Sequence, residues 1–288
     1  MNHISQTTQH QTFKHVQLVL MDLDGSALNP EQCLTPCLIA TLKQLKSRIP
    51  YTFISARSPH MMKAQCAQAD ISGPVVTLDG ALILDWNSQR KLQSFPFPVD
   101  TALNILELLA KAQADFTVYT TEHGYFQNHT PRIERFYRYN IQAVRAGVSP
   151  MKCLFYDACP PITIAKEGIL KIYIDGLSTA SQEELLHELQ VFSELRLDRT
   201  EKGSLSITMA QASKENAIHF LCEYLGMEPQ NICSFGDYYN DMKMLQMTGY
   251  SVAMGNAPQA VKDCAKFVTC SNAEDGVAHF IQAHLLNP

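Results

Sequence analysis

The chain has no long hydrophobic run and no long run of charge of one sign. Its 288 residues are 46% hydrophobic and 18% charged, but no apolar segment reaches the length of about eighteen residues that a membrane-spanning helix needs. The formal net charge of -5 is dispersed along the chain. It forms neither the basic footprint of a nucleic-acid-binding protein nor a polybasic membrane patch. We therefore predict a globular protein that binds neither nucleic acid nor membranes.

Signals of export are also missing. The first fifteen residues, MNHISQTTQHQTFKH, lack the apolar stretch of a signal peptide. The nine cysteines are odd in number and scattered, and none forms a CxxC pair. We interpret them as reduced thiols, because a disulfide framework would use paired cysteines at regular spacing. These absences predict a cytoplasmic protein with a flexible tail at residues 1–15, and they leave the oligomeric state open.

Strands and helices alternate in both terminal thirds of the chain. The first element, VQLVLMD, is a nearly continuous apolar run, as in a strand buried on both faces of a parallel sheet. A helix capped by Thr35 with Pro36 at its first position follows, then the strand YTFIS, a helix opened by Ser58 and Pro59, and the strand VVTL. Near the end, a helix between Ser213 and Gly226 leads to the strands NICSF, YSVAM and KFVT. The alternation predicts an α/β fold with a doubly wound, Rossmann-like parallel sheet, built from residues 16–84 and 210–288.

The middle of the chain, residues 85–209, has a different pattern. A helix is expected from about Asp100 to Ala114, followed by the strand FTVYT, the basic aromatic stretch PRIERFYRYN and the strand KIYID. A further helix is expected near Ser181, because Glu184 three residues later completes a capping box. We predict that this segment is an inserted α+β domain.

Asp22 and Asp24 follow directly on the first strand, separated by one residue. The period of two in a strand points their carboxylates in different directions. One could attack phosphorus while the other exchanges a proton with the ester oxygen. A solvated acidic turn is the alternative reading of this short motif.

Asp237 and Asp241 follow another apolar strand, at a turn that enters a helix. Mg²⁺ prefers hard oxygen ligands, and it usually takes one or two carboxylates together with water and substrate phosphate. Asp22, Asp237 and a water-bridged Asp241 could supply such a site. The alternative is that Asp237 and Asp241 only cap the helix.

Lys214 and Ser55 are candidates for holding a phosphoryl group. Lys214 lies in the first turn of the helix capped by Ser213, where its ammonium and the helix N-terminus both favour an anion. Ser55 ends the second strand and offers a hydroxyl donor. Each could equally be an ordinary surface or strand-end residue when considered alone.

The joint order of DxDG, a strand-end serine, a lysine and GDxxND resembles the haloacid dehalogenase-like hydrolase superfamily, and specifically its Cof-type sugar-phosphatase branch. The resemblance runs from about Val16 to Ile281 and is strongest in SFGDYYNDMKML, SVAMGNAP and EDGVAHFI. It implies a phosphatase that uses Mg²⁺ and a phosphoaspartate to hydrolyse small phosphorylated metabolites. These would be sugar phosphates, or phosphorylated cofactors such as pyridoxal phosphate or flavin mononucleotide.

The resemblance also implies a role for each motif residue. Asp22 would be the nucleophile and a metal ligand, and Asp24 the general acid and base that also offers its backbone carbonyl to the metal. Ser55 and Lys214 would hold the phosphoryl group, with Arg57 also in the substrate-binding set. The remaining roles fall to the second acidic motif: Asp237 and Asp241 complete the metal site, and Asn240 orients neighbouring groups and belongs to the substrate-binding residues.

Three departures from the family pattern stand at Ser26, Ala56 and Asp79. Asp79 replaces a common asparagine, and we expect its extra negative charge near the mouth of the site to affect substrate preference.

Two other classes of function stay open. A phosphomutase would use the same phosphoaspartate but need a bisphosphate activator, and a non-catalytic binding protein would normally have lost some of these residues.

Overall fold

The computed structural model describes residues 13–127, 130, 132–199 and 203–287. The chain divides into two compact units. The first combines Met1–Thr52 with Cys222–Pro288, and the second is Phe53–Leu221. The sequence placed the domain boundaries at residues 84 and 210, so the compact division falls elsewhere. The assignment of residues 85–209 as an inserted domain stays a prediction.

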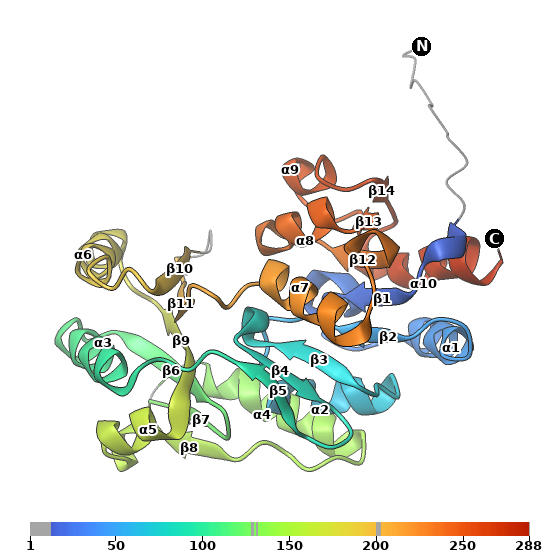
Figure 1. Ribbon diagram of the computed structural model, residues 1–288. Coiled ribbons are helices and arrows are strands. Elements are labelled where there is room, and N and C mark those ends of the chain that lie inside the picture. The colour runs from blue at the N-terminus through green and yellow to red at the C-terminus, as the bar shows by residue number, and fades with distance from the viewer. Residues whose placement is uncertain (1–12, 128–129, 131, 200–202, 288) are drawn as a thin grey trace. The chain divides into compact units, whose positions relative to one another are not determined.

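A five-stranded sheet organises the first unit (Figure 1). Its strands, in spatial order, are β14 (Phe267–Val268), β13 (Tyr250–Ala253), β12 (Ile232–Gly236), β1 (Leu18–Met21) and β2 (Tyr51–Phe53). The pairs β1 with β12, β12 with β13 and β13 with β14 are parallel. All four residues of β1 and all five of β12 are buried. The prediction of a parallel sheet is therefore confirmed.

Helices and short turns connect these strands. The helices are α1 (Pro36–Leu45), α8 (Met242–Met247), α9 (Gln259–Lys262) and α10 (Gly276–Ile281). The short turns are η1 (Phe13–His15), η2 (Leu23–Ala27), η5 (Pro229–Asn231), η6 (Tyr239–Asp241), η7 (Asn272–Glu274) and η8 (Gln282–Leu286). The predicted cap of α1 is confirmed, because the Thr35 side chain accepts a hydrogen bond from the Leu38 amide.

Phe13 anchors the start of the described chain. Its ring centroid lies 4.9–5.7 Å from those of Tyr250, Phe267, Phe280 and His284. Residues 1–12 of the predicted flexible tail lie outside the described residues. For residues 13–15 the flexible tail stays a prediction, and the Phe13 ring packs among aromatic side chains of the first unit.

The second unit contains two further sheets. The smaller one is antiparallel and consists of β3 (Pro74–Thr77), β4 (Leu82–Asp85) and β5 (Lys91–Ser94). The larger one has six strands, in the order β10 (Leu195–Arg199), β11 (Leu205–Met209), β9 (Ile169–Asp175), β6 (Asp115–Thr120), β7 (Gly124–Phe126) and β8 (Cys153–Phe155). Its pairs are antiparallel except β7 with β8. A parallel sheet and a separate antiparallel sheet confirm the predicted α/β fold class.

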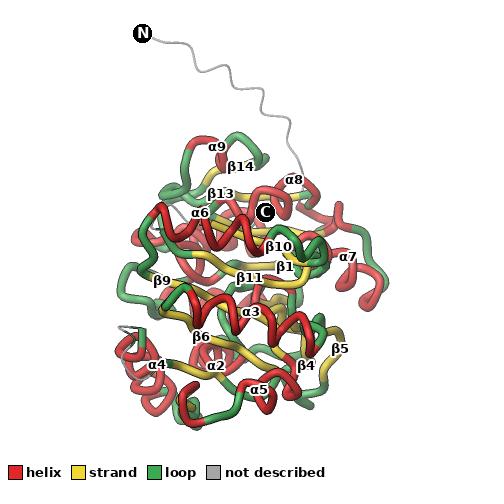
Figure 2. The backbone as a smooth tube through the Cα atoms, turned by 90° about the vertical axis from the view of Figure 1, so that its left-hand side faces the viewer, coloured by secondary structure: helices red, strands yellow, loops and turns green. Residues whose placement is uncertain are grey.

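The helices of this unit do not all pack against the same face of the six-stranded sheet. They are α2 (Pro59–Gln68), α3 (Val99–Lys111), α4 (Ile133–Arg145), α5 (Pro161–Gly168), α6 (Thr179–Leu189) and α7 (Lys214–Leu225), the last of which ends in the first unit. Apolar side chains of α3, α5 and α6 pack with Phe116, Val118 and Ile172, and Figure 2 shows α3 lying over β6. Since side chains alternate along a strand, the opposite face of the sheet carries polar residues such as Thr117 and Lys171, together with Tyr119 and Phe126, which pack with Phe136 of α4.

One helix start was predicted incorrectly. The cap of α6 is Ser178, whose side chain accepts a hydrogen bond from the Ser181 amide, so Ser181 is not the cap. Among the described residues, none of the helices combines the length and the apolarity that crossing a membrane requires.

Candidate active site

Three carboxylates of the first unit come together at the ends of two neighbouring strands. Asp22 follows β1 and Asp237 follows β12, and these strands are parallel neighbours. One carboxylate oxygen each of Asp22, Asp237 and Asp241 lie within 4.8 Å of one another. Asp22 is 6% exposed and Asp241 is fully buried. Carboxyl ends of parallel strands are where ligands bind in such sheets, so the predicted cluster forms where the sequence placed it.

The turn after β12 is shaped by Asp241. Its Oδ2 accepts hydrogen bonds from the amides of Asp237 at 3.0 Å and of Tyr238 at 3.1 Å. Asp241 therefore fixes the turn as a capping residue does, and it also takes part in the carboxylate cluster. The two alternatives considered from the sequence are compatible, because a carboxylate has two oxygens and about four lone pairs.

Glycines leave room for the cluster. Gly25 has a φ of +83°, and a Cβ at this position would collide with the Asp237 carboxylate. At Gly236, a Cβ would lie 2.6 Å from the Cβ of Asp241. The turn between β1 and α1 can therefore approach Asp237 only because residue 25 has no side chain.

Two further residues hold this turn, and no pattern in the sequence predicted this role for them. The Ser26 hydroxyl donates to Oδ1 of Asp237 at 2.9 Å, and the Asn256 side-chain amide donates to the carbonyl of Gly25 at 2.9 Å. Asn256 lies within SVAMGNAP, which the sequence marked only as a family pattern. Both contacts join segments more than 200 residues apart, so spacing along the chain could not reveal them.

Asp24 and Asn240 lie in the two turns that frame the cluster. Asp24 belongs to η2 with a φ of -74° and a ψ of 115°, so its backbone is not helical. Its carboxylate is not part of the three-carboxylate group found among the described residues. Asn240 lies in the middle of η6, next to Asp241. The separate roles predicted for both residues stay predictions.

Ser55, Arg57 and Lys214 belong to the second unit, and all three are buried. The Ser55 amide donates to the carbonyl of Val76, and the Ser55 Oγ accepts from the Arg57 amide at 3.2 Å. The Arg57 guanidinium lies 4.7 Å from the centroid of the Tyr139 ring. The joint action of these three residues with the carboxylate cluster stays a prediction.

Lys214 begins α7 as the sequence predicted. The Ser213 hydroxyl oxygen accepts from the Asn216 amide at 3.0 Å, which caps the helix. Gly226, directly after α7, has a φ of +67°. The capped start fixes the backbone from which the Lys214 side chain extends.

Asp79 is paired with a cation of the six-stranded sheet. Its Oδ2 lies 2.6 Å from the Lys171 ammonium. Burial alone would raise the pKa of Asp79, but the charges of Lys171 and Lys214 outweigh it and lower the pKa to about 2. The sequence suggested an extra negative charge here, whereas the structure shows a carboxylate compensated by Lys171.

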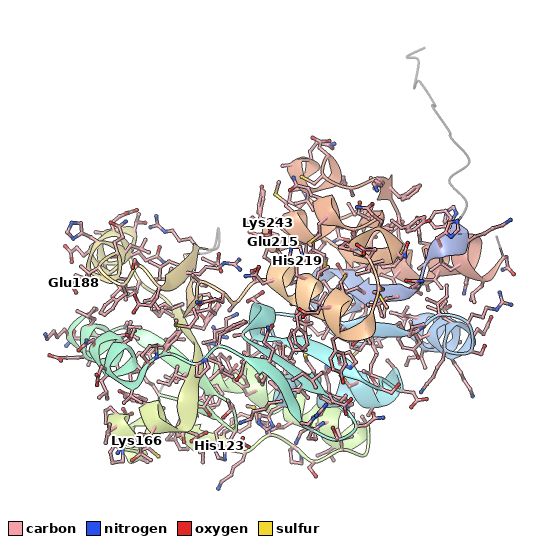
Figure 3. All side chains as sticks on the ribbon, viewed as in Figure 1. His123, Lys166, Glu188, Glu215, His219 and Lys243 are labelled. Carbon is pink, nitrogen blue, oxygen red and sulfur yellow. The ribbon has the colours of Figure 1, made fainter. Side chains whose placement is uncertain are left out.

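A second polar cluster surrounds Glu167, which no motif in the sequence indicated. The Tyr125 hydroxyl donates to Glu167 Oε2 at 2.5 Å, and Nδ1 of His123, labelled in Figure 3, lies 2.8 Å from Oε1. Thr120 also donates to Oε1. Burial raises the pKa of Glu167, but these three donors outweigh it and hold the pKa below its ordinary value.

Comparison with known proteins identifies the class to which this fold and site belong. The pattern of the family described as haloacid dehalogenase-like hydrolase matches residues 19–281. The chain therefore belongs to the haloacid dehalogenase-like hydrolases, in their Cof-type branch.

Individual relatives align with nearly the whole length of this chain. A protein of Haemophilus influenzae is 29% identical over 271 residues, which cover 92% of this chain and 96% of the relative. The pyridoxal phosphate phosphatase YbhA of Escherichia coli is 25% identical over 94% of this chain and 99% of its own. A solved haloacid dehalogenase-like hydrolase from Bacteroides thetaiotaomicron has the same fold, with a TM-score of 0.80 and 22% identity over 93% of this chain and 99% of that protein.

Proposed function

We propose that the protein is a Mg²⁺-dependent phosphatase that hydrolyses small phosphorylated metabolites through a phosphoaspartate on Asp22. The observation that carries this proposal is the cluster of Asp22, Asp237 and Asp241, whose carboxylate oxygens lie within 4.8 Å of one another at the end of β1. Three carboxylates so close together repel one another strongly unless a cation lies between them.

The donor set fits Mg²⁺. Hard oxygen ligands at this spacing suit a small divalent cation that keeps several waters. Asp22, Asp237 and Asp241 would hold the ion, which would neutralise charge on the transferring phosphoryl group when bound.

The chemistry of the chain's own residues follows in two steps. A carboxylate oxygen of Asp22 attacks phosphorus, the ester P–O bond breaks, and Asp24 gives its proton to the departing oxygen. Asp24 then takes a proton from water as the water oxygen attacks the phosphoaspartate. The new P–O bond replaces the bond to Asp22, and inorganic phosphate leaves. Ser55 and Lys214 would hold the phosphoryl oxygens.

The substrate is proposed as a class. Relatives named for their substrates act on pyridoxal phosphate, on 5-amino-6-(5-phospho-D-ribitylamino)uracil and on HMP-PP. These are different small phosphorylated molecules at 25–26% identity to this chain. We propose a substrate of the same kind, with residues 85–209 as the cap that selects it.

Phosphate release from a panel of sugar phosphates, phosphorylated cofactors and nucleotides, with and without Mg²⁺, tests the proposal. Wild-type protein should release phosphate only with Mg²⁺, and Asp22→Asn should release none. Asp263→Asn is the matched control, because this exposed aspartate of the first unit interacts with Gln259 and should keep full activity. Turnover by Asp22→Asn would exclude the phosphoaspartate, and silence of the wild type across the panel would exclude the phosphatase.

A further inference from the structure

On the face of the six-stranded sheet opposite α3, three cations each lie against a carboxylate. Lys171 on β9 lies 2.6 Å from Asp79, and Arg196 on β10 lies 2.9 Å from Asp198. The third cation, Arg132, lies 3.1 Å from Asp175 on β9. The charges within each of these three pairs cancel.

Of these pairs, Asp79 with Lys171 is the most buried. Asp79 is 8% exposed and Lys171 is 4% exposed. Arg196 and Asp198, in contrast, have side chains that are 27% and 40% exposed. A buried charge is screened less by solvent than an exposed one, so a change at this pair alters the local potential most.

Hydrogen bonds join the Asp79–Lys171 pair to the segment that carries Ser55. The Lys171 ammonium lies 3.4 Å from the carbonyl of Ala56, and the Asp79 amide donates to the carbonyl of Ser55 at 3.0 Å. The amide of Leu78 donates to the carbonyl of Arg57 at 2.9 Å. The charge of Asp79 is therefore held next to the predicted phosphoryl-binding serine.

The same turn is packed against the start of α7. A Cβ at Gly80 would collide with the carbonyl of Ser213, so the two backbones touch. The charge of Lys214 also acts on Asp79. Leu78 and Asp79 have φ values of 52° and 56°. Non-glycine residues adopt this conformation at a cost, and surrounding contacts must maintain it.

We propose that Asp79 sets the charge selectivity of the enzyme by neutralising Lys171 beside the segments that carry Ser55 and Lys214. Asp79 and Lys171 together carry no net charge, so the pair adds no positive charge to that of Lys214. The enzyme should therefore favour monoesters whose leaving group is uncharged over those that carry a second phosphate. This inference rests on the proposed phosphatase function and adds the class of leaving group.

The test compares two probes, fructose 6-phosphate and fructose 1,6-bisphosphate, by the ratio of their kcat/KM values. Asp79→Asn leaves Lys171 uncompensated, so the ratio of bisphosphate to monophosphate should rise about tenfold, which corresponds to about 1.4 kcal/mol. The change should appear mainly in KM for the bisphosphate. The rise should shrink as ionic strength increases, because salt screens the added charge.

Two further variants separate charge from structure. Lys171→Met leaves Asp79 uncompensated and should lower the ratio about tenfold, since roughly 1.4 kcal/mol changes a constant tenfold. The double variant with Asp79→Asn and Lys171→Met restores neutrality and should return the ratio to within about twofold of the wild type. If Asp79→Asn does not fold, the ratios measured for Lys171→Met and for the double variant still test the proposal. Glu183→Gln, which breaks the exposed pair with Arg199 on the same sheet, should leave the ratio unchanged.

An unchanged ratio in the folded single variants, or a double variant that keeps the altered ratio, would overturn the proposal. Failure of the phosphatase function itself has a different signature. In that case the wild type releases no phosphate from either probe or from the wider panel.

Discussion

Replacing Asp237 by asparagine should make the metal-free protein more stable and the Mg²⁺-bound protein less stable. Two unit charges at 4.8 Å, the upper limit of separation in the cluster, repel by about 3 kcal/mol at an effective dielectric constant of 20. Asp237 takes part in two of the three pairs. Because Asp237 is only partly buried, solvent reduces this figure, and we expect a gain of about 1–2 kcal/mol in the free energy of unfolding. Asparagine keeps the acceptor for the Ser26 hydroxyl.

Chemical unfolding in EDTA and in Mg²⁺ measures both effects. In EDTA, Asp237→Asn should unfold at a higher urea concentration than the wild type. Mg²⁺ at about 100 times its dissociation constant should stabilise the wild type by about 2.7 kcal/mol, and most of this gain should be lost in the variant. The order of stability therefore reverses between the two buffers, whereas Asp263→Asn should follow the wild type in both.

Two outcomes would refute this reasoning. If Asp237→Asn is less stable than the wild type in EDTA, the carboxylates do not repel one another as their spacing implies. If it gains as much from Mg²⁺ as the wild type, the ion binds elsewhere.

Three more predictions follow from contacts in the first and second units. Gly25→Ala should abolish Mg²⁺-dependent phosphate release and the Mg²⁺-induced rise in melting temperature, because the added Cβ would collide with the Asp237 carboxylate. The control is Gly226→Ala, which has a similar φ but no atom within 4 Å of the added Cβ; it should lose only about 1 kcal/mol of stability and stay active. Phe13→Ala should lower the free energy of unfolding by about 2–3 kcal/mol without changing kcat, and an unchanged urea midpoint would contradict the packing described for this ring. Because the pKa of Glu167 is lowered in the folded state, its stabilising effect is present above the ordinary value of 4.5 and is lost as the pH falls through the folded value. The difference in unfolding free energy between wild type and Glu167→Gln should therefore shrink as the pH falls below 4.5, and growth of this difference in acid would refute the assignment.

Much of the first unit could be predicted because its signals are local. The buried strands are continuous apolar runs, and Thr35 followed by Pro36 marks a helix start that needs no tertiary information. The meeting of Asp22 with Asp237 followed from a rule about parallel strands, since each aspartate comes directly after one. Their proximity across more than 200 residues was therefore available from the sequence.

The second unit was harder to predict because competing local signals occur there. Ser178 and Ser181 are three residues apart, and each precedes residues suited to the first turn of a helix. The end of β9 at Asp175 and the positive φ of Gly176 bring the chain into α6 early enough for Ser178 to be the cap. The strand β8 has only three residues, too few to show the alternation of apolar and polar residues that marks a strand. The strand β10, LRLDR, does alternate, but so short a signal did not predict a strand here.

The pairing of the Asp79 charge with Lys171 could not be predicted from the sequence. Asp79 and Lys171 lie 92 residues apart in the sequence. Asp79 lies on the turn between β3 and β4 of the three-stranded sheet, and Lys171 lies on β9 of the six-stranded sheet. From the sequence alone, Asp79 was an uncompensated negative charge expected to affect substrate preference. Paired with Lys171, it instead keeps the net charge near Lys214 low, and the expected effect on preference survives with a different physical cause.

The position of Asp241 shows that fixing a turn and joining a carboxylate cluster do not exclude each other. Its carboxylate accepts two backbone amides of the turn after β12 and also contributes to the cluster with Asp22 and Asp237. The amides fix the position of the carboxylate, and a fixed carboxylate is what a small cation with strict geometry requires. A residue that only capped the turn could be serine or asparagine, so the need for a second, anionic oxygen favours aspartate at this position.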